Sequence, residues 1–140
     1  MPHLTLEYSA NLRPEGGFDA LCRKLAHGLV SQQADGKAVY PLGGIRVRAL
    51  CAEDYCVGNG TLDAAFVHAT LKIGAGRSEQ TKSETGNTLF EIMKAHFEAL
   101  YARRGLALSL EISEFSEAGT WKHNNLHARF REAAGGSTPN

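Results

Sequence analysis

The sequence predicts an α+β fold, α/β within each half, in which two tandem βαβ units form one four-stranded sheet with two helices on one face. Four segments alternate apolar and polar residues, two others carry apolar residues at helical spacing, and the order strand, helix, strand occurs twice. Strands that are joined through a helix pair in parallel by a right-handed crossover. We therefore expect a single domain over residues 1–131, with repeats at about 2–54 and 63–114.

The first repeat is predicted from four consecutive patterns. Residues 3–8 alternate as a strand, and a Pro- and Gly-rich break at 13–17 ends it. From Phe18 to Leu29 the apolar residues follow helical spacing. A turn-rich loop over 34–44 leads to a second alternating strand at 45–52.

The second repeat follows the same order. Residues 64–73 alternate as a strand and are followed by a glycine-containing turn. Ser78 is a suitable N-cap for one long helix, which Gly105 ends. Residues 106–115 alternate as the fourth strand.

A sheet with helices on one face leaves its other face uncovered, whereas parallel sheets are usually buried on both sides. Self-association is the simplest way to cover it. The C-terminal segment 119–131 is amphipathic, through Trp121, Leu126 and Phe130, and could cover a neighbouring copy. Residues 132–140 have the composition of a flexible tail.

Composition excludes several classes of partner. Lys and Arg number 15, as do Asp and Glu, so the net charge is zero and no basic field attracts nucleic acid or anionic membrane. No apolar run is long enough to cross a bilayer. Three widely spaced cysteines (Cys22, Cys51 and Cys56) suit a reducing cytoplasm better than a disulfide framework.

Pro2 has two interpretations from its position alone. Proline is tolerated as the first residue of a strand. Removal of Met1 would instead make Pro2 a free secondary amine at the chain end, which can act as a one-proton base. The dipeptide alone favours the structural interpretation, because so short a motif often occurs by chance.

Three arginines are candidates for binding an anion. Arg77 lies between a strand end and a helix start, where spare N–H groups favour anions, although it could equally be an exposed loop residue. Arg46 and Arg48 share one strand face, which is either solvated or directed into a pocket that holds carboxylates. Arg13 is expected on a surface loop.

Histidines are weaker candidates. His123 and His127 have the i, i+4 spacing of a metal pair, but no third ligand is evident, and we expect exposed polar residues. His68 and His96 lie in apolar patterns and are expected to be partnered core residues.

Four stretches together resemble a known family. "MPH", "YPLGGIRVR", "HATLKIGAGRSEQTK" and "KHNNLHARF" are similar to the 5-carboxymethyl-2-hydroxymuconate Δ-isomerases of the tautomerase superfamily, from Pro2 to about residue 131. The resemblance implies a tautomerase-like duplication, a homotrimer, and catalysis by the amine of Pro2 after Met1 is removed. Arg46 and Arg77 match the arginines that hold substrate carboxylates. The second repeat has no terminal proline, so one site per chain is expected.

The resemblance also implies the chemistry. A small dicarboxylate or tricarboxylate dienol from the breakdown of aromatic acids is ketonised, and no metal or organic cofactor is required. Two alternatives stay open. One is a superfamily enzyme with another substrate, such as a decarboxylase or dehalogenase. The other is a non-catalytic trimeric carboxylate-binding protein.

Overall fold

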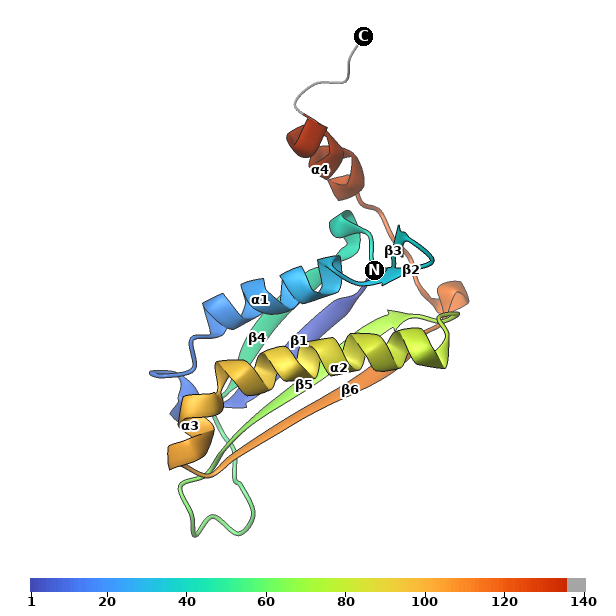
Figure 1. Cartoon of the computed structure of the whole chain (residues 1–140). Helices are drawn as coiled ribbons and strands as arrows, with labels where there is room; N and C mark the ends of the chain where they lie inside the picture. The colour runs from blue at the N-terminus through green and yellow to red at the C-terminus, as the bar shows by residue number, and fades with distance from the viewer. Residues whose placement is uncertain (136–140) are drawn as a thin grey trace.

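The computed structural model describes residues 1–135 and has two layers, a four-stranded sheet and a layer of helices (Figure 1). The strands lie in the order β4-β1-β5-β6. Their bounds are β1 His3–Ser9, β4 Arg46–Ala52, β5 Ala65–Gly74 and β6 Leu106–Phe115. Helices α1 (Phe18–Val30) and α2 (Glu79–His96) cover one face of this sheet, and the α+β prediction is confirmed.

Strand pairing follows the predicted duplication. Strand β1 pairs in parallel with β4, and β5 pairs in parallel with β6, so each repeat forms one parallel pair. The two repeats join through an antiparallel pairing of β1 with β5, in which Leu4 lies opposite Leu71 and Leu6 opposite Ala69. Since side chains alternate along a strand, this register places most apolar strand residues on the helix side, whereas Leu50 and Phe66 lie on the opposite face.

The hydrophobic core lies between the sheet and the two helices. Leu21, Leu25 and Leu29 of α1 are fully buried, as are Leu89 and Met93 of α2. The two helices approach closely at a glycine of α1, which packs directly against α2. None of the helices within residues 1–135 is long and apolar enough to span a membrane.

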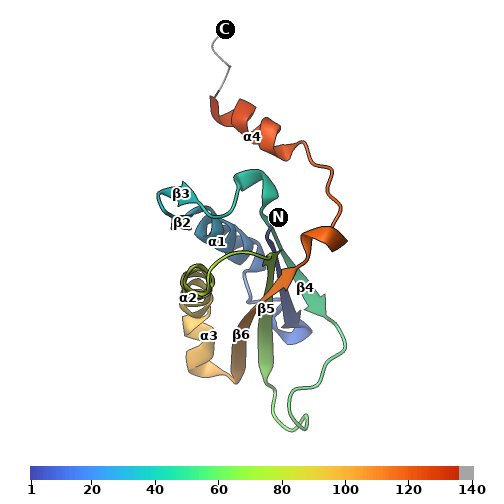
Figure 2. The same ribbon diagram turned by 90° about the vertical axis from the view of Figure 1, so that its right-hand side faces the viewer.

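The opposite face of the sheet is uncovered, as the sequence predicted (Figure 2). It carries polar side chains, and His68 is one of them, with its Nδ1 atom 2.7 Å from Ser109 Oγ. This finding places His68 on the open face rather than in the core. Strands β4 and β6 form the two sheet edges and have no further partner among the described residues.

The predicted long helix is interrupted. It ends at His96, and a separate helix α3 (Glu98–Arg103) follows Phe97, whose backbone angles depart from helical values. Phe97 is 1% exposed and its ring lies 5.9 Å from that of Phe18. Helical spacing already placed Phe97 on the apolar face, but it did not predict the interruption of the helix at this residue.

The predicted loop at 34–44 contains local structure. Strands β2 (Gln33–Ala34) and β3 (Lys37–Ala38) form a short hairpin. Asp35 and Gly36 connect them with φ angles of 53° and 75°, as a two-residue primed turn requires. Two 3-10 turns, η1 (Ala10–Leu12) and η2 (Leu42–Gly44), follow β1 and precede β4.

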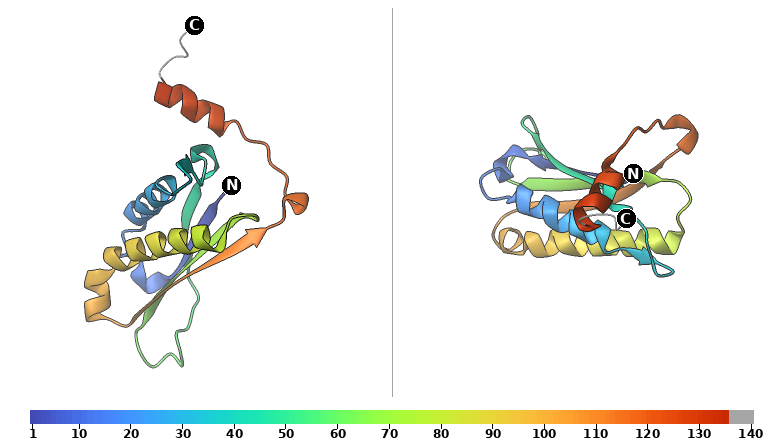
Figure 3. Two further views of the ribbon diagram at one scale, coloured as in Figure 1. Left: turned by 45° about the vertical axis from the view of Figure 1, so that its right-hand side comes forward. Right: turned by 90° about the horizontal axis from the view of Figure 1, so that it is seen from above.

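The C-terminal segment extends away from the two layers (Figure 3). After η3 (Glu117–Gly119), the chain passes the N-terminal end of β1 and enters helix α4 (Leu126–Gly135). Residues 132–135 of the predicted flexible tail are instead helical, in keeping with the helix propensity of two alanines there. Residues 136–140 of the expected tail lie outside the described residues.

Candidate active site

The topology brings distant parts of the chain to the N-terminus. Because β1 is parallel to β4 and antiparallel to β5, the start of β1 lies beside the start of β4 and the end of β5. Pro2 is buried, and its carbonyl oxygen accepts a hydrogen bond of 3.0 Å from the Arg46 backbone N–H. The turn that carries Arg77 follows the end of β5. The three residues singled out in the sequence therefore lie at one end of the sheet.

Arg46 is held in place by the turn before it. Its Nη1 atom donates to the carbonyl oxygens of Gly43 and Ile45, both at 3.0 Å. Gly44 of this turn lies against the N-terminus, and a Cβ atom there would make an ordinary 3.4 Å contact with Met1 Cα. These bonds use one of the guanidinium nitrogens and leave other N–H groups of Arg46 for a ligand.

Arg77 is anchored more extensively. Nη1 donates to the Gly74 carbonyl at 3.1 Å and Nη2 to the Val39 carbonyl at 3.2 Å. The guanidinium also lies over the Tyr40 ring, 4.8 Å from its centroid. The following helix starts as predicted, because Ser78 Oγ accepts a hydrogen bond from a backbone N–H in the first turn of α2.

The terminal amine lies in an environment that disfavours its protonated form. Burial, and then the positive charges of Lys122, Arg77 and Arg46, lower the pKa of the Met1 amine, while Glu117 acts in the opposite direction. A lowered pKa makes the amine a free base over more of the neutral pH range. The environment at the chain end therefore suits a proton acceptor.

A small cavity of about 410 Å³ opens beside this amine. Its lining combines the N-terminus and Arg46 with the C-terminal segment. The lining residues are Met1, Arg46, His123, Asn124, Asn125 and Leu126.

Sequence reasoning missed the contribution of residues 117–125. Asn124 Nδ2 donates to the Gly43 carbonyl at 3.1 Å, and its Oδ1 accepts from the Leu126 N–H at 2.7 Å. Lys122 belongs to the same segment. The stretch "KHNNLHARF" contributed to the family resemblance, but it has no periodic pattern that assigns a role to its individual residues.

Three of the arginines considered lie outside the cavity lining. Arg77 is one of them and stays anchored at the turn after β5. Arg48 points across the open face of the sheet, where its Nη1 donates to Nδ1 of His3 at 3.1 Å. Burial, and then Arg48, Arg46 and the terminal amine, lower the pKa of His3. Arg13 lies in the turn beyond the far end of β1, where it forms an ion pair with Glu53.

His96 has hydrogen-bond partners, as predicted, whereas His127 is less exposed than predicted. His96 Nε2 donates to the Gly16 carbonyl at 2.8 Å, and its Nδ1 lies 3.1 Å from Lys24 Nζ. His123 is exposed and His127 half-buried. Within residues 1–135 there is no group of three or more His, Cys, Asp or Glu residues that could hold a metal ion.

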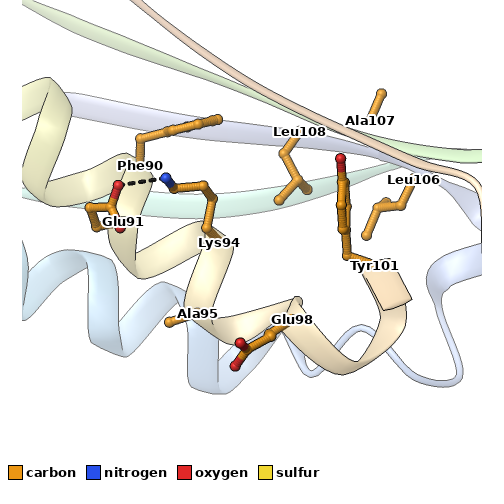
Figure 4. Close-up of a pocket in the computed structure, with 9 residues that line it drawn as sticks. All are labelled: Phe90, Glu91, Lys94, Ala95, Glu98, Tyr101, Leu106, Ala107 and Leu108. Atoms are coloured by element: carbon orange, nitrogen blue, oxygen red, sulfur yellow. Dashed lines mark ion pairs between the residues drawn. The ribbon is translucent and has the colours of Figure 1, made fainter. Parts of the chain in front are cut away.

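A larger cavity of about 680 Å³ lies elsewhere, between helices α2 and α3 and strand β6 (Figure 4). Its one lysine, Lys94, forms a 2.6 Å ion pair with Glu91, and Glu98 adds a second carboxylate. This cavity has no excess positive charge for an anionic ligand. The N-terminal cavity, which contains Arg46, is better suited to bind a carboxylate.

The four-stranded sheet with helices on one face is a tautomerase-like fold. A solved structure described as a fused 4-OT wild type symmetric trimer shares the fold with a TM-score of 0.62 and 16% identity, over 90% of this chain and 98% of that chain. Relatives with higher sequence identity identify the family within this fold. A 5-carboxymethyl-2-hydroxymuconate isomerase structure from Deinococcus radiodurans R1 has a TM-score of 0.85 and 52% identity, over 93% of this chain and 94% of that one.

Sequence comparison gives the same result. A 5-carboxymethyl-2-hydroxymuconate Delta-isomerase of Escherichia coli is 41% identical over 131 residues, which cover 94% of this chain and 100% of the relative. The sequence profile of 5-carboxymethyl-2-hydroxymuconate isomerase matches residues 2–130. The chain belongs to the 5-carboxymethyl-2-hydroxymuconate isomerase family.

Proposed function

We propose that this protein is a 5-carboxymethyl-2-hydroxymuconate Δ-isomerase whose base is the amine of Pro2 after removal of Met1. The observation that carries the proposal is the terminal amine, which lies among Lys122, Arg77 and Arg46 with a lowered pKa. Pro2 is the next residue inward and is buried. Its amine would therefore have the same cationic surroundings.

The reaction moves one proton and needs no net oxidation. The neutral amine of Pro2 takes the hydroxyl proton of the 2-hydroxydiene as the C–O bond becomes a ketone and the double bonds shift along the chain. The protonated amine then returns the proton to a carbon of the former diene, which leaves the remaining double bond conjugated with the ketone. Arg46 and Arg77 bind carboxylates and stabilise the negative charge that develops during the transfer.

The active form is proposed to be a homotrimer in the cytoplasm. The uncovered sheet face and the unpartnered edges of β4 and β6 provide surfaces for self-association. The related fold described as a symmetric trimer supports this stoichiometry. Cys22, Cys51 and Cys56 are free thiols, which suits a reducing compartment. Light scattering during gel filtration should give three times the chain mass, whereas one or two chain masses would contradict the trimer.

The N-terminus provides the direct test of mechanism. Intact mass spectrometry should show that Met1 is absent from the active protein. A variant with one extra residue before Pro2 should lose more than about 100-fold in the rate of ketonisation, followed by ultraviolet absorbance, because its Pro2 nitrogen is an amide. A variant with one residue added after Asn140 is the matched control and should keep its activity.

The same experiment separates the alternatives. Full activity of the N-terminally extended variant contradicts the role of the Pro2 amine. Tight binding of the dienol without turnover by the processed protein would indicate a carboxylate-binding module. Turnover of a different acid, with none of the dienol, would indicate another enzyme of the superfamily.

A further inference from the structure

We propose that Lys122 binds the third carboxylate of the substrate and thereby selects the carboxymethyl-bearing acid over the simple dicarboxylate. The inference rests on the proposed function. A 5-carboxymethyl-2-hydroxymuconate ion carries two carboxylates on the muconate chain and a third on the carboxymethyl arm. Arg46 and Arg77 account for two of them, so one further cation is needed at the same site.

Lys122 lies in the segment that closes the N-terminal cavity. The next three residues, 123–125, all line the cavity together with Met1 and Arg46. Asn124 ties this segment to the opposite wall through its 3.1 Å hydrogen bond to the Gly43 carbonyl, and its Nδ2 atom lies 3.7 Å from Met1 Sδ. Lys122 is therefore the residue next to the cavity lining along the chain, although it does not line the cavity itself.

Contacts with Glu117 and Phe115 orient the Lys122 side chain. Its Nζ atom lies 3.1 Å from Glu117 Oε2 and 5.9 Å from the centre of the Phe115 ring. Glu117 in turn packs on Gly74, where a Cβ atom would lie 3.1 Å from Glu117 Oε1. The Gly74 carbonyl is also the acceptor for Arg77. Lys122 is thus linked through Glu117 to the turn that anchors Arg77.

The ammonium of Lys122 keeps capacity for a ligand. It has three N–H donors, and one carboxylate cannot satisfy all of them in good geometry. The Lys122 side chain is 34% exposed and that of Glu117 is 65% exposed, so the pair is open to solvent. An exposed ion pair of this kind is weak, and a second carboxylate can share or displace the first.

The discriminating experiment compares two substrates that differ only in the carboxymethyl arm. In Lys122→Gln, kcat/KM for 5-carboxymethyl-2-hydroxymuconate should fall roughly 10- to 100-fold, as expected for loss of a hydrogen bond between charged groups. For 2-hydroxymuconate, which lacks the arm, kcat/KM should change by less than about 3-fold. Both kcat/KM values are measured at a pH where kcat/KM no longer changes with pH. A change in the pKa of the amine then does not affect the comparison. Lys122→Arg should restore most of the discrimination, because it keeps the charge.

Lys94→Gln is the matched control. Lys94 also forms an ion pair with a glutamate, Glu91, and lies 5.6 Å from the centre of a phenylalanine ring, Phe90, but it belongs to the other cavity. Its substitution should leave both kcat/KM values unchanged.

Two outcomes overturn the proposal. An equal loss of kcat/KM with both substrates would mean that Lys122 acts through the amine or the fold. No loss with either substrate would mean that Lys122 does not contact the substrate. If the wild-type protein turns over neither acid, the proposed function fails separately. Calorimetric binding of the two acids then tests Lys122: the tricarboxylate should bind at least about 10-fold tighter to the wild type but not to Lys122→Gln. Equal discrimination by both proteins would contradict the role.

Discussion

Asn124 Nδ2 and Arg46 Nη1 donate hydrogen bonds to the same oxygen, the carbonyl of Gly43, at 3.1 and 3.0 Å. One residue belongs to the C-terminal segment and the other to the start of β4. The shared acceptor links the segment that closes the cavity with a side chain proposed to hold a substrate carboxylate. Removing either donor should therefore affect the position of the other.

Asn124→Ala should weaken substrate binding without removing the base. The loss of one neutral hydrogen bond corresponds to roughly a 2- to 10-fold rise in KM, with kcat within about 2-fold, because Arg46 and the closing segment lose a common anchor. Steady-state ketonisation kinetics provide the measurement. Asn59→Ala is the control, since Asn59 makes the same type of turn bond, to the Thr61 N–H, in the loop between β4 and β5. An unchanged KM in Asn124→Ala would contradict the link.

The pH profile should respond to Glu117. The base is active when neutral, so the acid limb of kcat/KM follows the pKa of the terminal amine and should lie below the ordinary value of roughly 8. Glu117 raises that pKa. Glu117→Gln should therefore move the acid limb to lower pH, whereas Glu91→Gln, which also removes a lysine partner, should leave it in place. A shift to higher pH would show that the sign of this charge effect is wrong.

Tyr40 and Thr85 should be strongly coupled in stability. Tyr40 Oη and Thr85 Oγ1 form a 3.0 Å hydrogen bond in the core, and the Tyr40 ring lies under Arg77. Thr85→Val leaves the tyrosine hydroxyl buried without this partner and should lower the free energy of unfolding by about 1–3 kcal/mol. The double variant with Tyr40→Phe should lose less than the sum of the single variants. Urea unfolding gives these values, and simple additivity would contradict the coupling.

Two helix glycines should respond oppositely to alanine. A Cβ atom at Gly28 would lie 2.7 Å from Ile92 Cδ1, whereas one at Gly86 would make an ordinary 3.5 Å contact with Ile112 Cδ1. Gly28→Ala should destabilise the protein by about 1–3 kcal/mol through overpacking between α1 and α2. Gly86→Ala should stabilise it by about 0.5–1 kcal/mol through helix propensity. Thermal unfolding measures both, and a shift of the same sign in each would contradict the packing argument.

Local sequence patterns predicted the regular elements because their periods are set by the backbone. The alternation at 3–8 and 106–115 gave strands, and the spacing from Phe18 to Leu29 gave a helix, as observed. The break at Phe97 was not predictable, since burial of that ring depends on Phe18, which is distant in sequence. The hairpin around Asp35 was not predicted, and neither was the extension of the C-terminal helix to Gly135. Neither segment has a periodic pattern long enough to indicate its structure.

The sequence by itself determined the duplicated fold, its family, and the candidates Pro2, Arg46 and Arg77. Only the tertiary structure decided which groups share a site, because the antiparallel pairing of β1 with β5 brings the chain start beside the turn after β5. It also added Lys122, whose positive charge lowers the pKa of the N-terminal amine although the two groups are far apart in the sequence. Charge acts through space rather than along the chain, so this contribution has no local signature in the sequence.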